Sequence, residues 1–226
     1  MDYTPTHVEA YDLHGESHTG TSTVTPLRLD AFQLSDEDKI ALIERNFREI
    51  MLTLGLDLTD DSLAGTPHRV AKMYVKELFS GLNPSNLPKA TTFDNSYRYG
   101  QMLVERNISV HSMCEHHFVP IIGVAHVAYI SSGKVIGLSK LNRIVRHFAK
   151  RPQVQERLTT EVANHLRQVL ATDDVAVVID SKHYCVIMRG IEDTGSSTVT
   201  SAYSGRFEDP TVRDEFLRYV ALESPR

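Results

Sequence analysis

Apolar residues first recur at helical spacing between Ile40 and Leu54. Ser35 precedes this stretch as a favourable N-cap residue, and Asp38 stands where its carboxylate can complete a capping box. Gly55 follows, and glycine is the usual residue just beyond a helix end. We therefore expect a helix that begins after Ser35 and ends before Gly55.

A second helix is predicted to begin at Thr66-Pro67, with threonine as its cap and proline in the first turn, and to end at Gly81. A loop rich in proline and asparagine follows over residues 83–89. From Leu103 onward, apolar and polar residues alternate, and this pattern predicts a strand.

Another strand is predicted over Val119–Ile130, where Pro120 indicates a sheet edge or an irregular start. Cys114–His117 interrupts the alternation and is expected to form a turn or a strand end. The remaining predicted elements are a helix capped by Ser139, a helix opened by Pro152, strands over Val175–Ile179, Tyr184–Arg189 and Ser196–Ser201, and a final helix capped by Asp209-Pro210. Because these elements lack the regularity of βαβ units, we expect an α+β fold with antiparallel strands.

Residues 1–34 contrast with the rest of the chain, because they hold many threonine, serine, histidine and acidic residues and few apolar ones. We expect a mobile tail there, in which His7, His14 and His18 are solvated. An ordered domain is expected over residues 35–226.

Composition places the chain among globular proteins, since 41% of its 226 residues are hydrophobic and 23% are charged. A net charge of −5 argues against a general role at nucleic acids or membrane surfaces. No apolar run reaches the length of a membrane span, and no secretory signal is visible. Two cysteines cannot form a disulfide framework, so we expect the reducing cytoplasm.

The two cysteines carry the main chemical signal, because each stands within three residues of a histidine. Cys114 and His117 have CxxH spacing, and Cys185 follows His183 by two positions. Two thiolates and an imidazole suit Zn²⁺, and three protein ligands leave the open position that is typical of catalytic zinc. The alternative is a pair of buried free cysteines that pack as small hydrophobes.

His116 and His183 are candidates for proton transfer, since an imidazole titrates near neutral pH. His116 is expected to diverge from its neighbour His117 and to face a substrate. His183 is expected to share a strand face with Cys185 and so to lie beside the metal. A hydrogen-bonded structural role is the alternative for each histidine.

Five cations are expected at helix starts or near the metal, where they indicate a polyphosphate substrate. Two lie three residues apart on the second helix, and two more follow Ser139 in the same spacing. A helix N-terminus with such cations can bind a phosphate group. Solvated surface charges are the alternative for any one pair. The five are Arg69, Lys72, Lys140, Arg143 and Arg189.

Gln155-Glu156 stands near the start of the helix that follows Pro152. A carboxylate there can accept two hydrogen bonds from the adjacent N1–H and N2–H₂ donors of guanine, an arrangement that adenine lacks. Ordinary capping of a first helical turn is the alternative.

Together these segments resemble the GTP cyclohydrolase I family, from about Ser35 to Leu222. The matching segments are Thr66–Tyr74, Cys114–Phe118, Gly137–Leu141, Arg151–Leu158 and His183–Cys185. The resemblance implies a T-fold at about 101–226 after a helical part at about 35–100. It also implies a ring-shaped homodecamer of two stacked pentamers with active sites at subunit boundaries.

The resemblance further implies a role for each candidate residue. Cys114, His117 and Cys185 would bind Zn²⁺. Catalysis would use His116, His183 and Ser139, guanine would bind Gln155 and Glu156, and triphosphate would bind Arg69, Lys72, Ser139, Lys140, Arg143 and Arg189. The implied reaction converts GTP and water to formate and 7,8-dihydroneopterin triphosphate, through attack at C8, ring opening and an Amadori-type rearrangement.

Two other functions compete with this interpretation. A zinc deaminase needs an H-x-E segment paired with P-C-x-x-C, but His7-Val8-Glu9 lies in the tail and the chain has no C-x-x-C. A zinc-stabilised oligomeric binding protein without catalysis is the second, and intact His116 and His183 argue against it. The sequence alone leaves open the downstream pathway, any regulator, the role of the tail and the oligomeric state.

Overall fold

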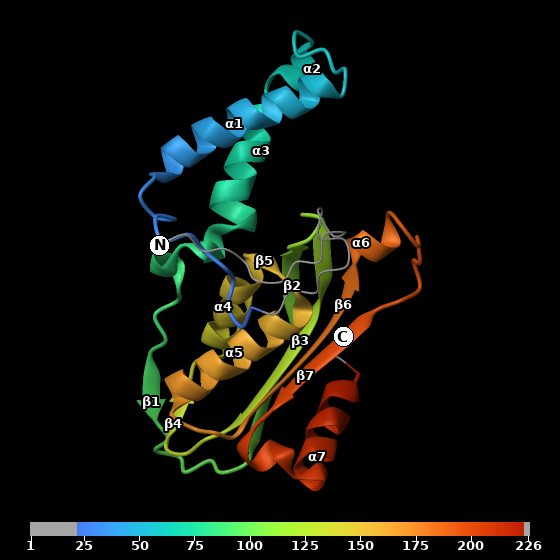
Figure 1. The fold of residues 1–226 in the computed structure, drawn as a ribbon. Helices are drawn as coiled ribbons and strands as arrows, with labels where there is room; N and C mark the ends of the chain where they lie inside the picture. The colour runs from blue at the N-terminus through green and yellow to red at the C-terminus, as the bar shows by residue number, and fades with distance from the viewer. Residues whose placement is uncertain (1–21, 224–226) are drawn as a thin grey trace, which may run out of the picture.

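The structure is a computed structural model that describes residues 22–223, and it combines a five-stranded sheet with a projecting helical arm (Figure 1). The expectations for His7, His14 and His18, and for the rest of residues 1–21, lie outside the described residues. Within residues 22–223, none of the helices is both long enough and apolar enough to span a bilayer.

The large sheet has the strand order β5-β2-β3-β6-β7, and its pairs are antiparallel except for β2 with β5. Its strands are β2 (Met102–Cys114), β3 (Pro120–Ile130), β5 (Pro152–Gln153), β6 (Val175–His183) and β7 (Thr198–Tyr203). A separate small sheet, which the sequence did not predict, pairs β1 (Thr92–Asp94) with β4 (Lys134–Ile136). The α+β class is confirmed.

The helices divide between the arm and the body. The arm holds α1 (Asp36–Thr53), α2 (Asp61–Ala64), α3 (Thr66–Met73) and the π-helical turn η1 (Tyr74–Leu78), and the short turns η2 (Ser80–Leu82) and η3 (Pro84–Asn86) follow. The body holds α4 (Leu138–Ala149), α5 (Gln155–Leu170), α6 (Tyr184–Ile187), η4 (Gly205–Glu208) and α7 (Pro210–Ala221).

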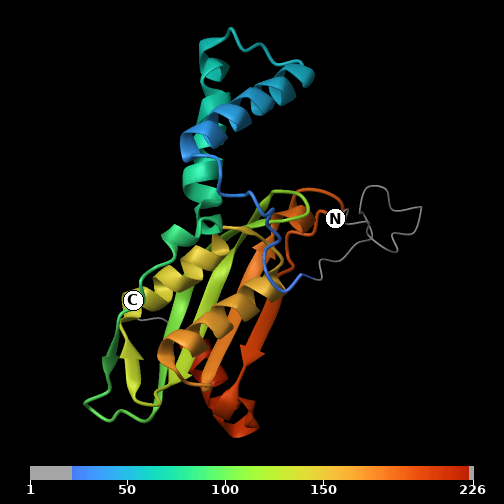
Figure 2. The same cartoon turned by 60° about the vertical axis from the view of Figure 1, so that its left-hand side comes forward.

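Helices cover both faces of the large sheet, as Figures 1 and 2 show together. On one face, α4 and α5 bury a continuous apolar cluster in which Leu158, Val162 and Leu166 are fully inaccessible to solvent. On the other face, α7 and η4 bury a smaller cluster around Phe207 and Phe216. Burial of one such side chain contributes about 1.5–3 kcal/mol, so both clusters stabilise the packing of the helices against the sheet.

Two of the predicted helix caps are confirmed in atomic detail. The Ser35 hydroxyl accepts a hydrogen bond from the Asp38 backbone N–H at 3.1 Å and donates one to the Asp38 carboxylate at 2.7 Å. Asp209 accepts hydrogen bonds from the backbone N–H groups of Thr211 and Val212 at the start of α7.

The two other predicted caps are wrong. Gly65 rather than Thr66 is the N-cap of α3, because α2 ends at Ala64 and α3 begins at Thr66, which leaves only Gly65 between the two helices. Gly137 rather than Ser139 is the N-cap of α4, because β4 ends at Ile136 and leaves only Gly137 in extended geometry. Both hydroxyl residues therefore lie inside the first helical turn.

The predicted strand over Tyr184–Arg189 is also wrong. β6 continues past Ile179 to His183, and Tyr184–Ile187 forms the helical turn α6. The last pair between β3 and β6 joins Ile121 to His183, so the chain beyond His183 has no neighbouring strand to bond. Backbone groups without a ladder partner are instead satisfied within a helical turn.

Pro120 does not mark a sheet edge. It is the first residue of β3, a central strand that lies between β2 and β6. Proline is tolerated there because a strand's first residue needs no N–H donor.

Candidate metal centre and nucleotide pocket

The end of β2 folds back on itself to form a tight turn, here called the metal turn (residues 114–118). The Cys114 backbone N–H donates to the Val119 carbonyl at 2.8 Å, and the Phe118 N–H donates to the Cys114 carbonyl at 2.9 Å. Phe118 adopts φ +54°, which closes the turn. His117 is thereby returned to the neighbourhood of the buried Cys114.

Cys185 reaches the same place from a distant part of the chain. It lies in α6, directly after β6, whose last residue pairs with the start of β3. The ligand atoms of Cys114, His117 and Cys185 all lie within 4.8 Å of one another. The predicted proximity of these three residues is confirmed, although a helical turn and not a strand carries Cys185.

The donor set suits a divalent metal of borderline softness. Burial and the neighbouring Cys114 sulfur raise the pKa of the Cys185 thiol, and Arg189 acts in the opposite direction. Two thiols held this closely favour a cation between them, because a metal ion deprotonates coordinating thiols outright. Two sulfurs and an imidazole with a fourth position open are a known catalytic zinc arrangement.

A pocket of about 390 Å³ opens beside the three ligands, and its volume falls within the range of small-molecule sites. It brings together residues from the metal turn, the β5–α5 junction and the end of β6. Its lining consists of Cys114, His116, Gln153, Val154, Gln155, Glu156, His183 and Cys185.

His183 is held in one orientation by Gln155. The Gln155 amide nitrogen donates to the carbonyls of Ile179 and Thr198 and to the Thr200 hydroxyl, at 3.0, 2.8 and 3.1 Å. Its oxygen must therefore face His183, whose Nε2 lies 2.7 Å away and donates to it. Burial lowers the pKa of His183, and Glu156 partly opposes this shift. A neutral imidazole in this tautomer leaves Nδ1 as its proton acceptor.

The predicted guanine-binding pair divides into a buried and an exposed member. Gln155 is 1% exposed and its amide is engaged by the protein. Glu156 is exposed, lines the pocket from the first turn of α5, and is the carboxylate available to a ligand. A guanine contact remains a prediction for both residues.

His116 is exposed at the pocket mouth. Its Nδ1 lies 3.9 Å from the Cys114 sulfur, and its Nε2 lies 3.8 Å from a carboxylate oxygen of Glu115. The histidine ring is therefore placed between a candidate metal ligand and an acidic side chain.

Only one of the predicted phosphate-binding cations lies at the metal turn. Arg189 Nη1 is 2.9 Å from His117 Nε2, although Arg189 follows α6 instead of lying on the predicted strand. The remaining predicted triphosphate residues do not line the pocket. They are Arg69 and Lys72 on α3, and Ser139, Lys140 and Arg143 on α4.

Most of the cations outside the pocket have no side-chain partner within the described residues. Within residues 22–223, the side chains of Lys72, Lys140 and Arg143 make no hydrogen bond or ion pair. Arg69 folds back on its own helix start, where it donates to the Thr66 hydroxyl at 2.8 Å.

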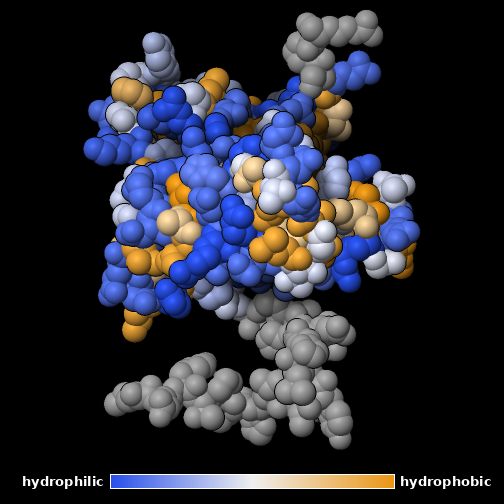
Figure 3. Space-filling model, turned by 90° about the horizontal axis from the view of Figure 1, so that it is seen from above, coloured by the Kyte–Doolittle hydropathy of each residue, from blue (hydrophilic) through white to orange (hydrophobic). Residues whose placement is uncertain are grey.

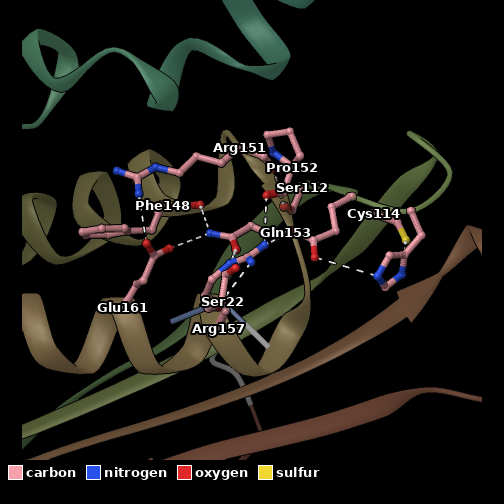
Figure 4. Close-up of polar contacts among 11 residues, drawn as sticks. Ser22, Ser112, Cys114, Phe148, Arg151, Pro152, Gln153, Arg157 and Glu161 are labelled. Carbon is pink, nitrogen blue, oxygen red and sulfur yellow. Dashed lines mark hydrogen bonds and ion pairs between the residues drawn. The ribbon is translucent and has the colours of Figure 1, made fainter. Parts of the chain in front are cut away.

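Sequence reasoning gave no role to a buried polar cluster behind the metal turn (Figure 4). It includes Glu115, Gln153, Arg157 and Glu161, and Arg157 bonds Glu115 across 42 residues. One signal was available, since Arg157 and Glu161 lie four apart on α5 beside core positions, where charged side chains are rare unless paired.

Comparisons with known proteins point to one family. A family model described as GTP cyclohydrolase I matches residues 43–221. The GTP cyclohydrolase 1 of Flavobacterium johnsoniae is 61% identical over 213 residues, which cover 94% of this chain and 96% of that protein. That of Aeromonas salmonicida is 55% identical over 194 residues, covering 85% and 88% of the two chains, respectively. That of Citrobacter koseri is 52% identical over 197 residues, covering 87% and 89%.

Proposed function

The chain belongs to the GTP cyclohydrolase I family, and from this premise we propose that the pocket beside Cys114, His117 and Cys185 is its active site. The enzyme converts GTP and water to 7,8-dihydroneopterin triphosphate and formate, the first step of pterin and folate biosynthesis. The observation that carries the site assignment is the convergence of two sulfurs and one imidazole within 4.8 Å.

We propose Zn²⁺ as the metal held by Cys114, His117 and Cys185. When bound, Zn²⁺ supplies the Lewis-acid chemistry that activates water near neutral pH. The fit rests on the donor set and on the open pocket at its side.

His183 is proposed to move the proton that opens the imidazole ring of guanine. Its Nε2–H is committed to Gln155, so Nδ1 is the atom that takes up and returns a proton. The lowered pKa keeps the ring neutral before reaction, which is the form that accepts. His116, with Ser139, is proposed to assist the later proton transfers of the ribose rearrangement.

Glu156 is proposed to accept the N1–H and N2–H₂ hydrogen bonds of guanine, with Gln155 as the buried support behind it. It lines the pocket from the first turn of α5, and within the described chain its carboxylate makes no hydrogen bond or ion pair. Arg189 is proposed to bind the triphosphate from the metal turn side.

We propose that each active site is completed by a neighbouring subunit within a ring-shaped homodecamer of two pentamers. The pocket lining does not include Arg69, Lys72, Ser139, Lys140 and Arg143. A single chain therefore supplies the candidate metal ligands at the pocket but not most of the residues proposed to bind the triphosphate. Viewed from above, hydrophobic patches lie exposed among hydrophilic residues (Figure 3). On the arm helix α1, the exposed large apolar residues are Leu42, Ile50 and Leu52, and Leu54 follows its end. Such a surface fits burial against another copy.

The proposed architecture is a T-fold over about residues 101–226, with a helical part over about residues 35–100. We propose the cytoplasm as the location, because a site built on two free thiols requires a reducing compartment.

The direct test incubates the purified protein with GTP and follows formate together with the absorbance of the pterin product. We expect both products to appear in equal amounts. Release of phosphate or of ammonia without formate would contradict the assignment and would indicate a phosphohydrolase or a deaminase.

A further inference from the structure

The buried polar cluster behind the metal turn forms a continuous hydrogen-bonded network (Figure 4). Arg157 donates through Nη2 to the Glu115 carboxylate and through Nε to the Gln153 side-chain oxygen, the latter at 2.9 Å. The Gln153 amide nitrogen donates to Glu161 at 2.7 Å, and Arg151 donates to the other Glu161 oxygen at 3.1 Å. This network thus contains two arginines, two carboxylates and one amide, and its charges balance.

A contribution to folding stability does not by itself explain this network. The Arg157 side chain is 3% exposed and that of Glu115 is 17% exposed, so both charges have been largely removed from water. The cost of desolvating a buried ion pair is often as large as the attraction it gains. A buried ion pair can instead be retained because it fixes one conformation of the residues that carry it.

The conformation fixed here is that of the metal turn. Glu115 lies between Cys114 and His116, its backbone N–H donates to the Gln153 carbonyl at 3.1 Å, and its second carboxylate oxygen lies 3.8 Å from His116 Nε2. Arg157 therefore holds the Glu115 side chain on one side while Gln153 holds its backbone on the other.

The far end of this network is hydrogen-bonded to the base of the arm. Arg151 Nε donates to the Gly81 carbonyl at 2.9 Å, and the Gly81 N–H donates to the Lys150 carbonyl at 2.9 Å. A Cβ at Gly81 would meet the His147 carbonyl oxygen at 2.0 Å, so only glycine allows this close approach. The cluster is thus fixed by hydrogen bonds to closely packed backbone.

We propose that Arg157 and Glu115 are a pair of positioning residues that holds His116 and the metal turn in the geometry required for turnover. This inference rests on the proposed assignment of Cys114 and His117 as metal ligands. Neither positioning residue lines the pocket. Their effect passes through the turn that carries the reacting groups.

Arginine is required at this position because its donors work in several directions at once. The Arg157 guanidinium contacts Glu115, the Gln153 side chain and, at 3.4 Å, the Pro152 carbonyl. Lysine is a point charge on a flexible stem and cannot reproduce that planar fork. Arg157→Lys therefore keeps the charge and loses the positioning.

The test compares Glu115→Gln, Arg157→Lys and their double variant with the control Arg167→Lys. Arg167 lies on the same helix and pairs with Asp173, but both partners of that pair are exposed and remote from the pocket. Each test variant is expected to lower kcat for GTP about tenfold or more, with KM and zinc content close to the wild-type values. The double variant is expected to be no slower than the slower single variant, because the pair acts as a unit. The control is expected to match wild type.

Cobalt substitution provides a readout that is independent of turnover. A thiolate-to-cobalt absorption band is expected in wild type and in every variant, which separates misplacement of His116 from loss of a metal ligand. Wild-type kcat in both single variants, additive losses in the double variant, or a loss of kcat matched by loss of the band would each overturn the proposal. Absence of the band in wild type would instead overturn the ligand assignment on which the proposal rests.

Discussion

The two halves of the proposed site differ in how much of their environment one chain supplies. Around the metal turn, the candidate ligands, the candidate proton-transfer histidines and their buried supports come from four segments of one chain, and most have identified partners. The cations of α3 and α4 that we propose to bind phosphate are exposed or half-buried, and three of them have no side-chain partner in the described chain. The first half is preorganised within one chain, whereas the second is the part that we propose to be assembled between subunits.

The most severe way to break this contrast is to remove a ligand from the preorganised half. Cys185→Ser should lose zinc and activity together, with turnover lower by on the order of 10³-fold or more, because water activation depends on the metal. Elemental analysis and formate release measure the two losses. Lys140→Ala is the matched comparison from the other half and should keep its zinc. Unchanged zinc in Cys185→Ser would rule out the ligand assignment.

Removal of the proton carrier should leave the metal in place. His183→Ala is expected to keep its zinc and to lower formate release by roughly 10²-fold or more, which is the usual contribution of a general acid–base group. Measurement of kcat beside zinc content separates this residue from the ligands. Full activity in the variant would refute the proton-transfer role.

Mixing Cys185→Ser with Lys140→Ala, both of which are expected to lose turnover, tests whether the two halves of the site come from different chains. Cys185→Ser retains the cations of α4, and Lys140→Ala retains the metal ligands. Dissociated and reassociated at equal ratio, the two should regain roughly a quarter of the wild-type sites, since sites form from randomly mixed chains. Turnover of the mixture is compared with that of each variant alone. No gain over either parent would place both residues in a site within one chain.

Guanine recognition should be affected more moderately. Glu156→Gln replaces one carboxylate oxygen by an NH₂ group, so one of the two guanine donors loses its acceptor, which costs about 1–3 kcal/mol, or roughly tenfold in GTP affinity. Binding of inorganic triphosphate is the control and should change little. Calorimetry with both ligands measures the difference, and an equal loss for both would count against base recognition by this carboxylate.

The smallest expected effect is that of ionic strength. Raising salt from about 0.05 M to 0.5 M should raise KM for GTP by roughly threefold and leave kcat and zinc content unchanged, because exposed charges are screened and buried pairs are not. Steady-state kinetics at constant pH tests this. A fall in kcat with constant KM would reverse the proposed contrast.

Local signals predicted much of the fold. The caps at Ser35 and Asp209 depend on residues within three positions, and the structure reproduces both. The core face of α5 follows from apolar spacing in one continuous segment. In contrast, the caps at Thr66 and Ser139 were wrong because the preceding elements, α2 and β4, determine where each helix begins.

The site was predictable where chemistry constrains residue type and unpredictable where packing decides. Cysteine and histidine at short spacing indicated the metal ligands, and the structure brings the three together. The end of the β3–β6 ladder, which turns Cys185 into a helical residue, is a tertiary property. So is the Arg157–Glu115 pair, whose members are 42 residues apart.

We propose that two sulfurs and one imidazole hold a zinc ion that turnover requires. The most direct measurement removes metal with a chelator, then titrates Zn²⁺ back while formate release from GTP is followed. Activity should vanish on removal and return in proportion to added zinc until each chain has bound one ion. Full turnover by protein shown to be metal-free would rule out the requirement for zinc.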